Sequence, residues 1–118
     1  MDDSKPIFLQ VAEQIENDIL DGSIAEEDQV PSTNEISAFY RINPATAGKG
    51  VNLLVERGIL YKKRGIGMFV STGARGLITQ NRKAEFREEY LIPLLTEAEK
   101  LGIDTTQLIE LINKENNS

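Results

Sequence analysis

Two short helices joined by a tight turn constrain this chain more than any other feature of its sequence. Ser32-x-x-Glu35 has the pattern of a capping box, in which a hydroxyl and a carboxylate each satisfy a free backbone N–H at a helix start. The helix that it opens is expected to end near Tyr40. Asn43-Pro44 then supplies an N-cap and a first helical residue, so another helix starts almost at once. This spacing predicts a helix-turn-helix.

The helix that starts at Pro44 is expected to run to Arg57 and to stop at Gly58. At helical spacing, positions 47, 50, 51 and 54 are expected to pack inward. The face expected to be exposed consists of Pro44, Ala45, Thr46, Gly48, Lys49 and Asn52. A glycine inside a helix costs about 1 kcal/mol of stability relative to Ala, so the presence of Gly48 and Gly50 requires an explanation. Before this motif, an amphipathic first helix is predicted by the apolar stripe of Ile7, Phe8, Val11, Ala12, Ile15, Ile19 and Leu20. Tight packing of Gly50 against that first helix and close approach of a DNA backbone at Gly48 are both open.

A β-hairpin is predicted directly after this helix. Two short β-prone runs, residues 59–63 and 68–71, flank a loop that contains Gly65 and Gly67. A hairpin in this position is the wing of a winged helix-turn-helix. Its tip is expected to carry Lys62, Lys63 and Arg64.

The C-terminal third is expected to be helical and to associate with another chain. Helical periodicity covers residues 77–101, where Pro93 should kink or split the helix, and Asp104-x-x-Gln107 predicts a cap for a last helix. Some 40 residues bury too little surface to be stable alone. Pairing in a homodimer is therefore favoured, with docking onto the N-terminal domain as the alternative. The expected dimerisation residues are Tyr90, Leu91, Leu94, Leu95, Ala98, Leu101, Leu108, Ile109 and Ile112.

The predicted fold class is mostly α with a small β-hairpin. A winged helix-turn-helix DNA-binding domain is expected over residues 1–72, with a linker at about 71–76. A short helical dimerisation region is expected over residues 77–118.

Charge is distributed unevenly along the chain, although the net charge is −6. Residues 1–40 carry one Lys against ten acidic residues, whereas residues 41–76 carry seven basic residues against Glu56 alone. A phosphate backbone responds to the field within about 10 Å rather than to the total charge. The middle third is therefore the segment expected to face DNA.

Composition argues against catalysis and against metal or cofactor binding. The chain has no Cys and no His, which removes disulfides, the commonest general base and the commonest metal ligand. Residues 22–31 are expected to form a loop, and its acidic run at residues 26–28 is expected to be solvated rather than to bind a metal. No apolar stretch approaches the roughly 20 residues of a membrane span, and Met1-Asp2-Asp3 does not begin a signal peptide. A cytoplasmic protein with no membrane partner is expected.

Several motifs follow one another at a spacing that resembles the GntR family of bacterial regulators, in particular its YtrA branch. The resemblance covers residues 6–70. Its motifs are Val30-Pro31-Ser32-x-x-Glu35-Ile36, Asn43-Pro44-Ala45-Thr46, Glu56-Arg57-Gly58-Ile59-Leu60 and Arg64-Gly65-x-Gly67-x-Phe69-Val70. The resemblance implies an N-terminal winged helix-turn-helix, followed in this branch by a very short helical piece. It also implies a local repressor.

Carried over to these residues, the resemblance implies a phosphate contact by Thr46 and a minor-groove approach by the wing glycines. Arginines common in the family are replaced here by Asn34, Pro44 and Gly48. We therefore expect Asn34 or Asn52 to hydrogen-bond adenine, Lys49 to contribute a contact, and Ala45 to pack against a thymine methyl. These contacts predict an A/T-rich half-site. The full set of expected DNA contacts is Ser32, Asn34, Asn43, Pro44, Ala45, Thr46, Gly48, Lys49, Asn52, Lys62, Lys63, Arg64, Gly65 and Gly67.

The function predicted from these features is sequence-specific DNA binding by a transcriptional regulator. We expect a repressor that binds an inverted-repeat operator as a homodimer. The alternative is a winged-helix module that binds protein without specific DNA binding, which the basic middle third argues against. The sequence indicates no particular effector.

Overall fold

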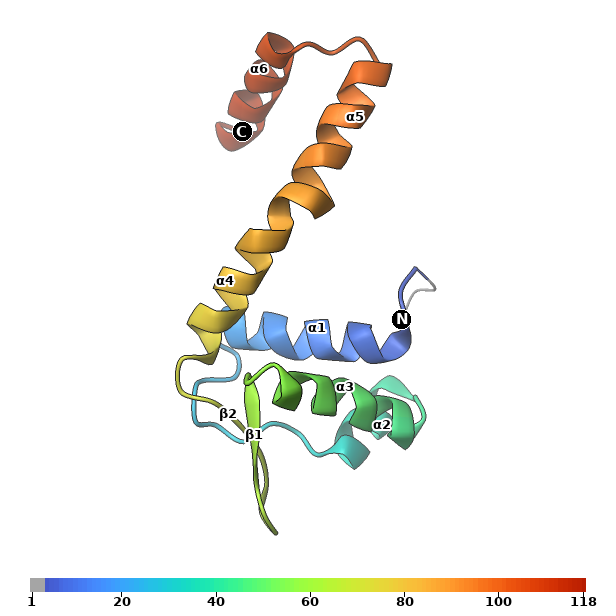
Figure 1. The fold of residues 1–118 in the computed structure, drawn as a ribbon, viewed down its shortest axis with the longest axis vertical. Helices are drawn as coiled ribbons and strands as arrows, with labels where there is room; N and C mark the ends of the chain where they lie inside the picture. The colour runs from blue at the N-terminus through green and yellow to red at the C-terminus, as the bar shows by residue number, and fades with distance from the viewer. Residues whose placement is uncertain (1–3) are drawn as a thin grey trace. The chain divides into compact units, whose positions relative to one another are not determined.

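The computed structural model describes residues 4–118, so the acidic start at residues 1–3 lies outside the described part. The chain divides into two compact units, the first reaching Gln80 and the second running from Asn81 to Ser118. The elements in Figure 1 are α1 (Ile7–Leu20), α2 (Thr33–Tyr40), α3 (Pro44–Glu56), β1 (Leu60–Lys63), β2 (Gly67–Val70), α4 (Ala74–Phe86), the π-helical turn η1 (Arg87–Leu91), α5 (Ile92–Lys100) and α6 (Thr105–Asn116). The predicted fold class, mostly α with a small β-hairpin, is confirmed.

The helix starts predicted around the turn are confirmed. The Ser32 hydroxyl accepts a hydrogen bond from the Glu35 N–H at 3.1 Å, and the Glu35 carboxylate accepts one from the Ser32 N–H at 3.1 Å. The Asn43 side chain accepts a hydrogen bond from the Ala45 N–H at 2.8 Å, with Pro44 as the first helical residue. These local bonds satisfy N–H groups that have no partner within the helix.

The turn between α2 and α3 is held by hydrogen bonds between Ser37 of α2 and Ile42 of the turn. Arg41 has a left-handed conformation with φ of 56°, which ends α2. The buried Ser37 hydroxyl donates to the Ile42 carbonyl at 2.6 Å, and the Ile42 N–H donates to the Ser37 carbonyl at 3.0 Å. This pair of bonds fixes the direction in which α3 leaves the turn.

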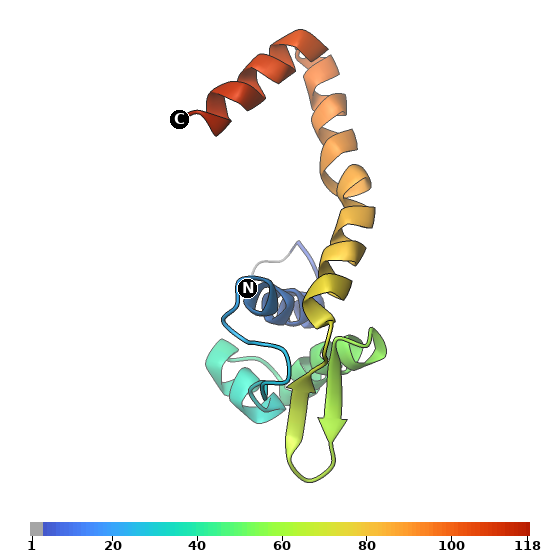
Figure 2. The same cartoon turned by 90° about the vertical axis from the view of Figure 1, so that its left-hand side faces the viewer.

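The hairpin of β1 and β2 projects from the helices of the first unit (Figure 2). The strands are antiparallel and pair Leu60 with Val70 at one end and Lys63 with Gly67 at the other. Residues 27–30, expected to lie in a loop, run along the other edge of β2. The Glu27 N–H donates to the Val70 carbonyl at 2.8 Å, and the Val30 N–H donates to the Met68 carbonyl at 2.9 Å. The segment before α2 therefore braces the wing.

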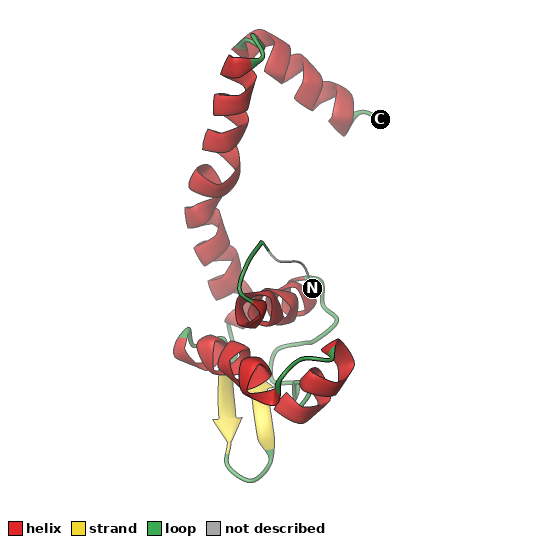
Figure 3. Ribbon diagram, turned by 90° about the vertical axis from the view of Figure 1, so that its right-hand side faces the viewer, coloured by secondary structure: helices red, strands yellow, loops and turns green. Residues whose placement is uncertain are grey.

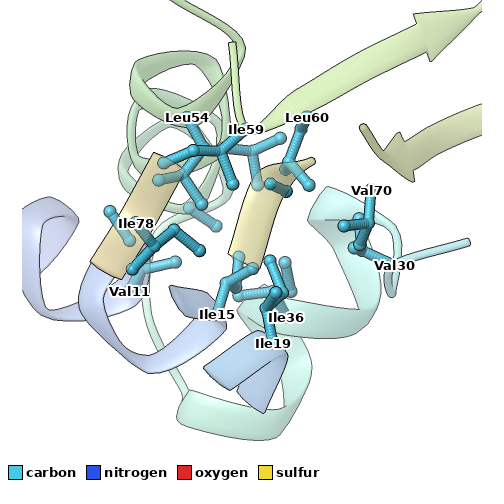
Figure 4. Close-up of a cluster of buried hydrophobic side chains, with 14 residues drawn as sticks. Val11, Ile15, Ile19, Val30, Ile36, Leu54, Ile59, Leu60, Val70 and Ile78 are labelled. Carbon is cyan, nitrogen blue, oxygen red and sulfur yellow. The ribbon is translucent and has the colours of Figure 1, made fainter. Parts of the chain in front are cut away.

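One apolar core joins the helices and the hairpin of the first unit. Figure 4 shows side chains of α1, α2 and α3 meeting those of the hairpin and of α4. The most deeply buried large residues are Ile19, Leu54, Ile59, Leu60, Ile78, Val11, Val51 and Val70.

The linker expected at residues 71–76 is shorter than predicted, because α4 already begins at Ala74. Ala74 and Ile78 lie one helical turn apart, and both are buried in the core of the first unit. Small polar residues suggested a loop, but burial of this apolar pair favours a helix over the same stretch.

In the second unit a π-helical turn interrupts the α-helix just before Pro93, where the sequence predicts a kink or a split. Figure 3 draws the segments on both sides of this turn as helix, followed by a loop and the last helix. Proline offers no N–H and its ring clashes with the carbonyl four residues before it in a regular α-helix. Here the Ile92 N–H instead donates to the Arg87 carbonyl, five residues back. The predicted cap of α6 is also confirmed, since the Asp104 carboxylate accepts the Gln107 N–H at 2.8 Å. Among the described residues, no helix is long and apolar enough to cross a membrane.

Candidate nucleic-acid interface

The two faces of α3 are arranged as the sequence predicts. Positions 47, 50, 51 and 54 are all buried against α1 and the core. On the opposite face Pro44, Ala45, Lys49 and Asn52 are exposed, while Thr46 and Gly48 are half-buried. A helix held by one face after a tight turn presents its other face to whatever binds there.

A groove of about 540 Å³ runs along this outer face. The residues lining it are Phe8, Ala45, Gly48, Lys49, Asn52, Leu53 and Glu56. Phe8, at the start of α1, forms one wall, and the Lys49 ammonium lies 4.1 Å from the centre of its ring. This cation–π contact holds the lysine beside the groove, at a distance where such contacts are attractive.

The start of α2 adjoins the middle of α3. A Cβ placed on Gly48 would lie 3.7 Å from the Thr33 methyl group, which is an ordinary contact, and would meet nothing else. Packing within the chain therefore does not require glycine at position 48, whereas Gly50 packs tightly on α1 as expected. Ser32 and Asn34 flank Thr33 and are exposed. Their position brings the capped N-terminus of α2 next to the outer face of α3.

The tip of the wing differs from the prediction. Lys62 and Lys63 lie within β1, paired with Met68 and Gly67, so the turn itself holds Arg64, Gly65 and Ile66. All five positions from 62 to 66 are exposed. The first strand ends at Lys63 as expected, whereas the second begins one residue earlier than expected, at Gly67, whose φ of 147° favours glycine.

Aromatic side chains on one face of the hairpin hold Lys63. Its ammonium lies 4.2 Å from the centre of the Phe69 ring and 5.9 Å from that of Tyr61. The two rings stack with centres 6.0 Å apart. Lys63 is therefore partly engaged within the wing, whereas Lys62 projects from the opposite face of the strand, as alternation requires.

Gln29 supports the wing tip from the neighbouring segment. Its side-chain amide donates a hydrogen bond to the Ile66 carbonyl at 3.0 Å. A Cβ on Gly67 would overlap the same amide group, so the glycine leaves room for it. This bond ties the turn of the wing to the strand-like segment beside β2.

The acidic run at residues 26–28 is exposed, but its carboxylates have separate protein partners. The Glu26 carboxylate accepts hydrogen bonds from the N–H groups of Gly73 at 2.9 Å and Arg75 at 3.2 Å. These bonds, that of Gly73 foremost, hold the pKa of the Glu26 carboxyl below its usual range. The Tyr61 hydroxyl donates to Glu27 at 3.0 Å, and burial together with this bond raises the pKa of Tyr61. Glu26 and Glu27 are therefore not only solvated, as the sequence predicts for this run, but also hydrogen-bonded to other segments of the first unit.

Sequence reasoning missed the contributions of Phe8, Gln29 and Ile66 to this region. The sequence predicts Phe8 only as part of the apolar stripe of the first helix, and no local pattern links it to Lys49. Gln29 and Ile66 are 37 residues apart, so their contact follows from the sheet rather than from spacing. The exposed apolar side chain of Ile66, between two glycines, was the one available signal.

Residues 8–70 match the family model described as "Bacterial regulatory proteins, gntR family". Along nearly the whole chain there is similarity to the HTH-type transcriptional repressor YtrA of Bacillus subtilis (strain 168). The two are 28% identical over 111 residues, which cover 94% of this chain and 85% of YtrA.

Two solved structures are also similar. A putative transcriptional regulator of the GntR family from Bacteroides thetaiotaomicron has a TM-score of 0.77 and 32% identity, covering 94% of this chain and 96% of that one. The DNA-binding domain of AraR in complex with operator ORX1 has a TM-score of 0.55 and 33% identity, covering 57% of this chain and 81% of that one.

Proposed function

Because this chain belongs to the gntR family of bacterial regulatory proteins, we propose that it is a sequence-specific DNA-binding repressor that acts as a homodimer. It would bind an inverted-repeat operator and would act in the cytoplasm, where that DNA lies. The relatives support this proposal, since YtrA is named a transcriptional repressor and the AraR domain is bound to an operator.

The observation that carries the proposal is the free outer face of α3. Its inner face is buried at positions 47, 50, 51 and 54, whereas Ala45, Lys49 and Asn52 are exposed along the groove. A recognition helix docks in the major groove in this way, with base-reading side chains on the exposed face. Lys49 supplies positive charge, and Asn52 supplies an amide that can accept from the N6–H and donate to the N7 of adenine on its major-groove edge.

The remaining expected contacts surround this face. Ser32 and Asn34 at the start of α2 would contact phosphate or an adjacent base, and Asn43, Pro44 and Thr46 would contact the backbone at the start of α3. The wing would add Lys62, Lys63 and Arg64, with Gly65 and Gly67 permitting close approach to the minor groove.

Exposed apolar residues of the second unit support the homodimer. Ala98 and Leu108 are buried within that unit, but the other expected dimerisation residues are exposed. They are Tyr90, Leu91, Leu94, Leu95, Leu101, Ile109 and Ile112, with exposed fractions from 40% to 64%. Apolar surface of this extent is stabilised by a partner, and a two-fold dimer would match a two-fold operator.

The test is fluorescence anisotropy of the purified protein with DNA from upstream of its own gene, over a series of salt concentrations. Binding should be tighter than to scrambled DNA, and its log affinity should fall steeply with log salt. Footprinting should then show a two-fold symmetric protected site.

Equal and weak binding to both DNAs would contradict recognition of that region. Absence of binding even at low salt would favour the protein-interaction module instead. Binding that does not respond to salt would also favour that module, because phosphate contacts release counterions.

A further inference from the structure

Ile66 is an exposed aliphatic side chain at the turn of the wing. Its exposed fraction is 64%, and it lies between Gly65 and Gly67, neither of which has a side chain. A Cβ on Gly65 would meet nothing within 4 Å, so the described part of the chain does not crowd this side of the turn. Ile66 does not belong to the core of the first unit. Packing within the fold therefore does not explain an aliphatic residue at this position.

Hydrogen bonds fix the backbone of Ile66 on both sides. Its N–H donates to the Lys63 carbonyl at 2.9 Å, which closes the turn. Its carbonyl accepts from the Gln29 amide at 3.0 Å, which ties the turn to the segment beside β2. A side chain on a backbone that is already fixed loses little further freedom when it binds a partner, so its contacts contribute more to affinity. Ile66 is therefore a preorganised contact at the tip of the wing.

The charge around Ile66 favours a polyanionic partner. Residues 60–70 carry three basic side chains and no acidic one. The acidic Glu27 and Asp28 of the adjoining segment bond to the backbone of Val70, at the end of the hairpin away from the turn. A basic hairpin with one aliphatic residue at its tip matches the minor groove of DNA, where basic residues contact phosphates and aliphatic residues contact the bases.

An aliphatic side chain in the minor groove distinguishes A·T pairs from G·C pairs. Both kinds of pair present acceptors on the floor of this groove, but G·C adds the amino group of guanine. Isoleucine cannot accept a hydrogen bond from this group, so covering it leaves a donor without a partner. Over an A·T pair the same side chain covers no donor. Contact by Ile66 would therefore select A·T pairs.

We propose that Ile66 contacts the floor of the minor groove beside the operator half-site and selects A·T pairs there, an inference that rests on the DNA-binding function proposed above. The outer face of α3 reads the major groove of the half-site, whereas Ile66 reads the pairs that flank it. Specificity at the flank then comes from an apolar contact, in addition to the charge of the wing.

The experiment measures anisotropy with the operator that footprinting defines, in which one A·T pair at a time is replaced by diaminopurine·T. Diaminopurine keeps the major-groove edge of adenine and adds the amino group of guanine to the minor groove. At the pair that Ile66 contacts, the replacement should weaken binding of the parent chain by about fivefold or more, because the added donor is covered without a partner. Ile66→Ala should bind the unmodified operator more weakly and should largely lose this penalty.

Arg64→Ala is the matched variant in the same turn. It should weaken binding to the modified and unmodified operators alike and should retain the penalty, because it leaves the aliphatic contact in place. A penalty that Arg64→Ala loses and Ile66→Ala retains would assign the selection to charge and would overturn the inference.

Two further outcomes would overturn the inference and leave the DNA-binding function intact. One is specific, salt-dependent binding without a penalty at any A·T pair. The other is an Ile66→Ala variant that binds both the unmodified and the modified operators as the parent chain does. A parent chain that binds no operator would overturn the DNA-binding function itself, and the inference with it.

Discussion

A Cβ atom on Gly50 of α3 would lie 2.7 Å from the backbone carbonyl oxygen of Phe8 in α1. The same atom would lie 3.0 Å from the Cβ of Val11. A backbone carbonyl within a helix cannot move aside as a flexible side chain can. The crossing of α1 and α3, which holds the outer face of α3 in place, therefore depends on the absence of a side chain at this position.

Gly50→Ala should destabilise the first unit. Overpacking costs about 1–3 kcal/mol, and the better helix propensity of Ala returns roughly 1 kcal/mol of that. Urea unfolding followed by circular dichroism should show a lower midpoint than the parent chain. A stability equal to that of the parent would mean that α1 and α3 can separate without loss.

Gly48→Ala is the matched substitution two residues away, and it should affect function rather than stability. Its new methyl group meets only Thr33, at an ordinary contact distance of 3.7 Å. The free energy of unfolding should stay the same or rise by up to about 1 kcal/mol. Operator affinity, measured by anisotropy, should fall because the methyl group intrudes on the approach of DNA. Unchanged affinity would show that the DNA backbone does not approach at Gly48.

The parts of the fold predicted correctly from sequence rest on interactions between near neighbours. Ser32 with Glu35, and Asn43 with Ala45, satisfy helix N–H groups within three residues, so residue type and spacing reveal them. The two faces of α3 follow from the helical period for the same reason.

The parts that sequence could not reveal depend on residues brought together by the tertiary fold. The Glu26 carboxylate caps the start of α4 by accepting the N–H of Gly73, which lies 47 residues later, and no local pattern predicts that bond. The pairing of residues 27–30 with β2 could not be predicted, because the acidic composition of this segment is typical of a loop. The π-turn was equally hidden, since Pro93 predicts an interruption of the helix but not its geometry.

The Glu26 cap predicts a dependence of stability on pH. Its carboxyl has a folded pKa below the ordinary value of 4.5, because the Gly73 and Arg75 N–H groups stabilise the charged form. A lowered folded pKa contributes stability that is present above pH 4.5 and is lost as the pH falls through the folded pKa. Glu26→Gln should therefore be less stable than the parent at pH 7, with the difference disappearing in acid.

The pH dependence of that difference is the informative quantity, because Asp21 and Glu35 also have lowered pKa values and weaken the parent chain in acid. Both groups remain in the variant, so their effect cancels. Glu110→Gln, at an exposed position of α6, is the control and should leave the unfolding of the first unit unchanged. A constant difference between parent and Glu26→Gln from pH 7 to pH 3 would contradict the charged cap.

The exposed charge at the wing tip predicts a change in the salt response of DNA binding. Arg64 lies in the turn of the hairpin and is exposed. Arg64→Ala should weaken binding to all sequences alike and should reduce the slope of log affinity against log salt by about one. Lys100→Ala, in the second unit, removes the same charge and should leave the slope unchanged. Equal slopes for the parent and Arg64→Ala would exclude a phosphate contact at the tip.

Base readout by the outer face of α3 predicts the composition of the operator. This face has no Arg, the residue most often paired with guanine, and instead exposes Asn52, Lys49 and Ala45. An amide pairs with adenine and a methyl group packs on thymine, so a library of random DNA should yield an A/T-rich half-site. Asn52→Ala should relax the preference at one adenine, at a cost of about 1–3 kcal/mol on the preferred sequence, and leave the flanking positions unchanged. Selection of a guanine-dominated half-site would instead place the specificity on Lys49 or on the wing, since Asn52 and Ala45 offer guanine no matching pair of donors.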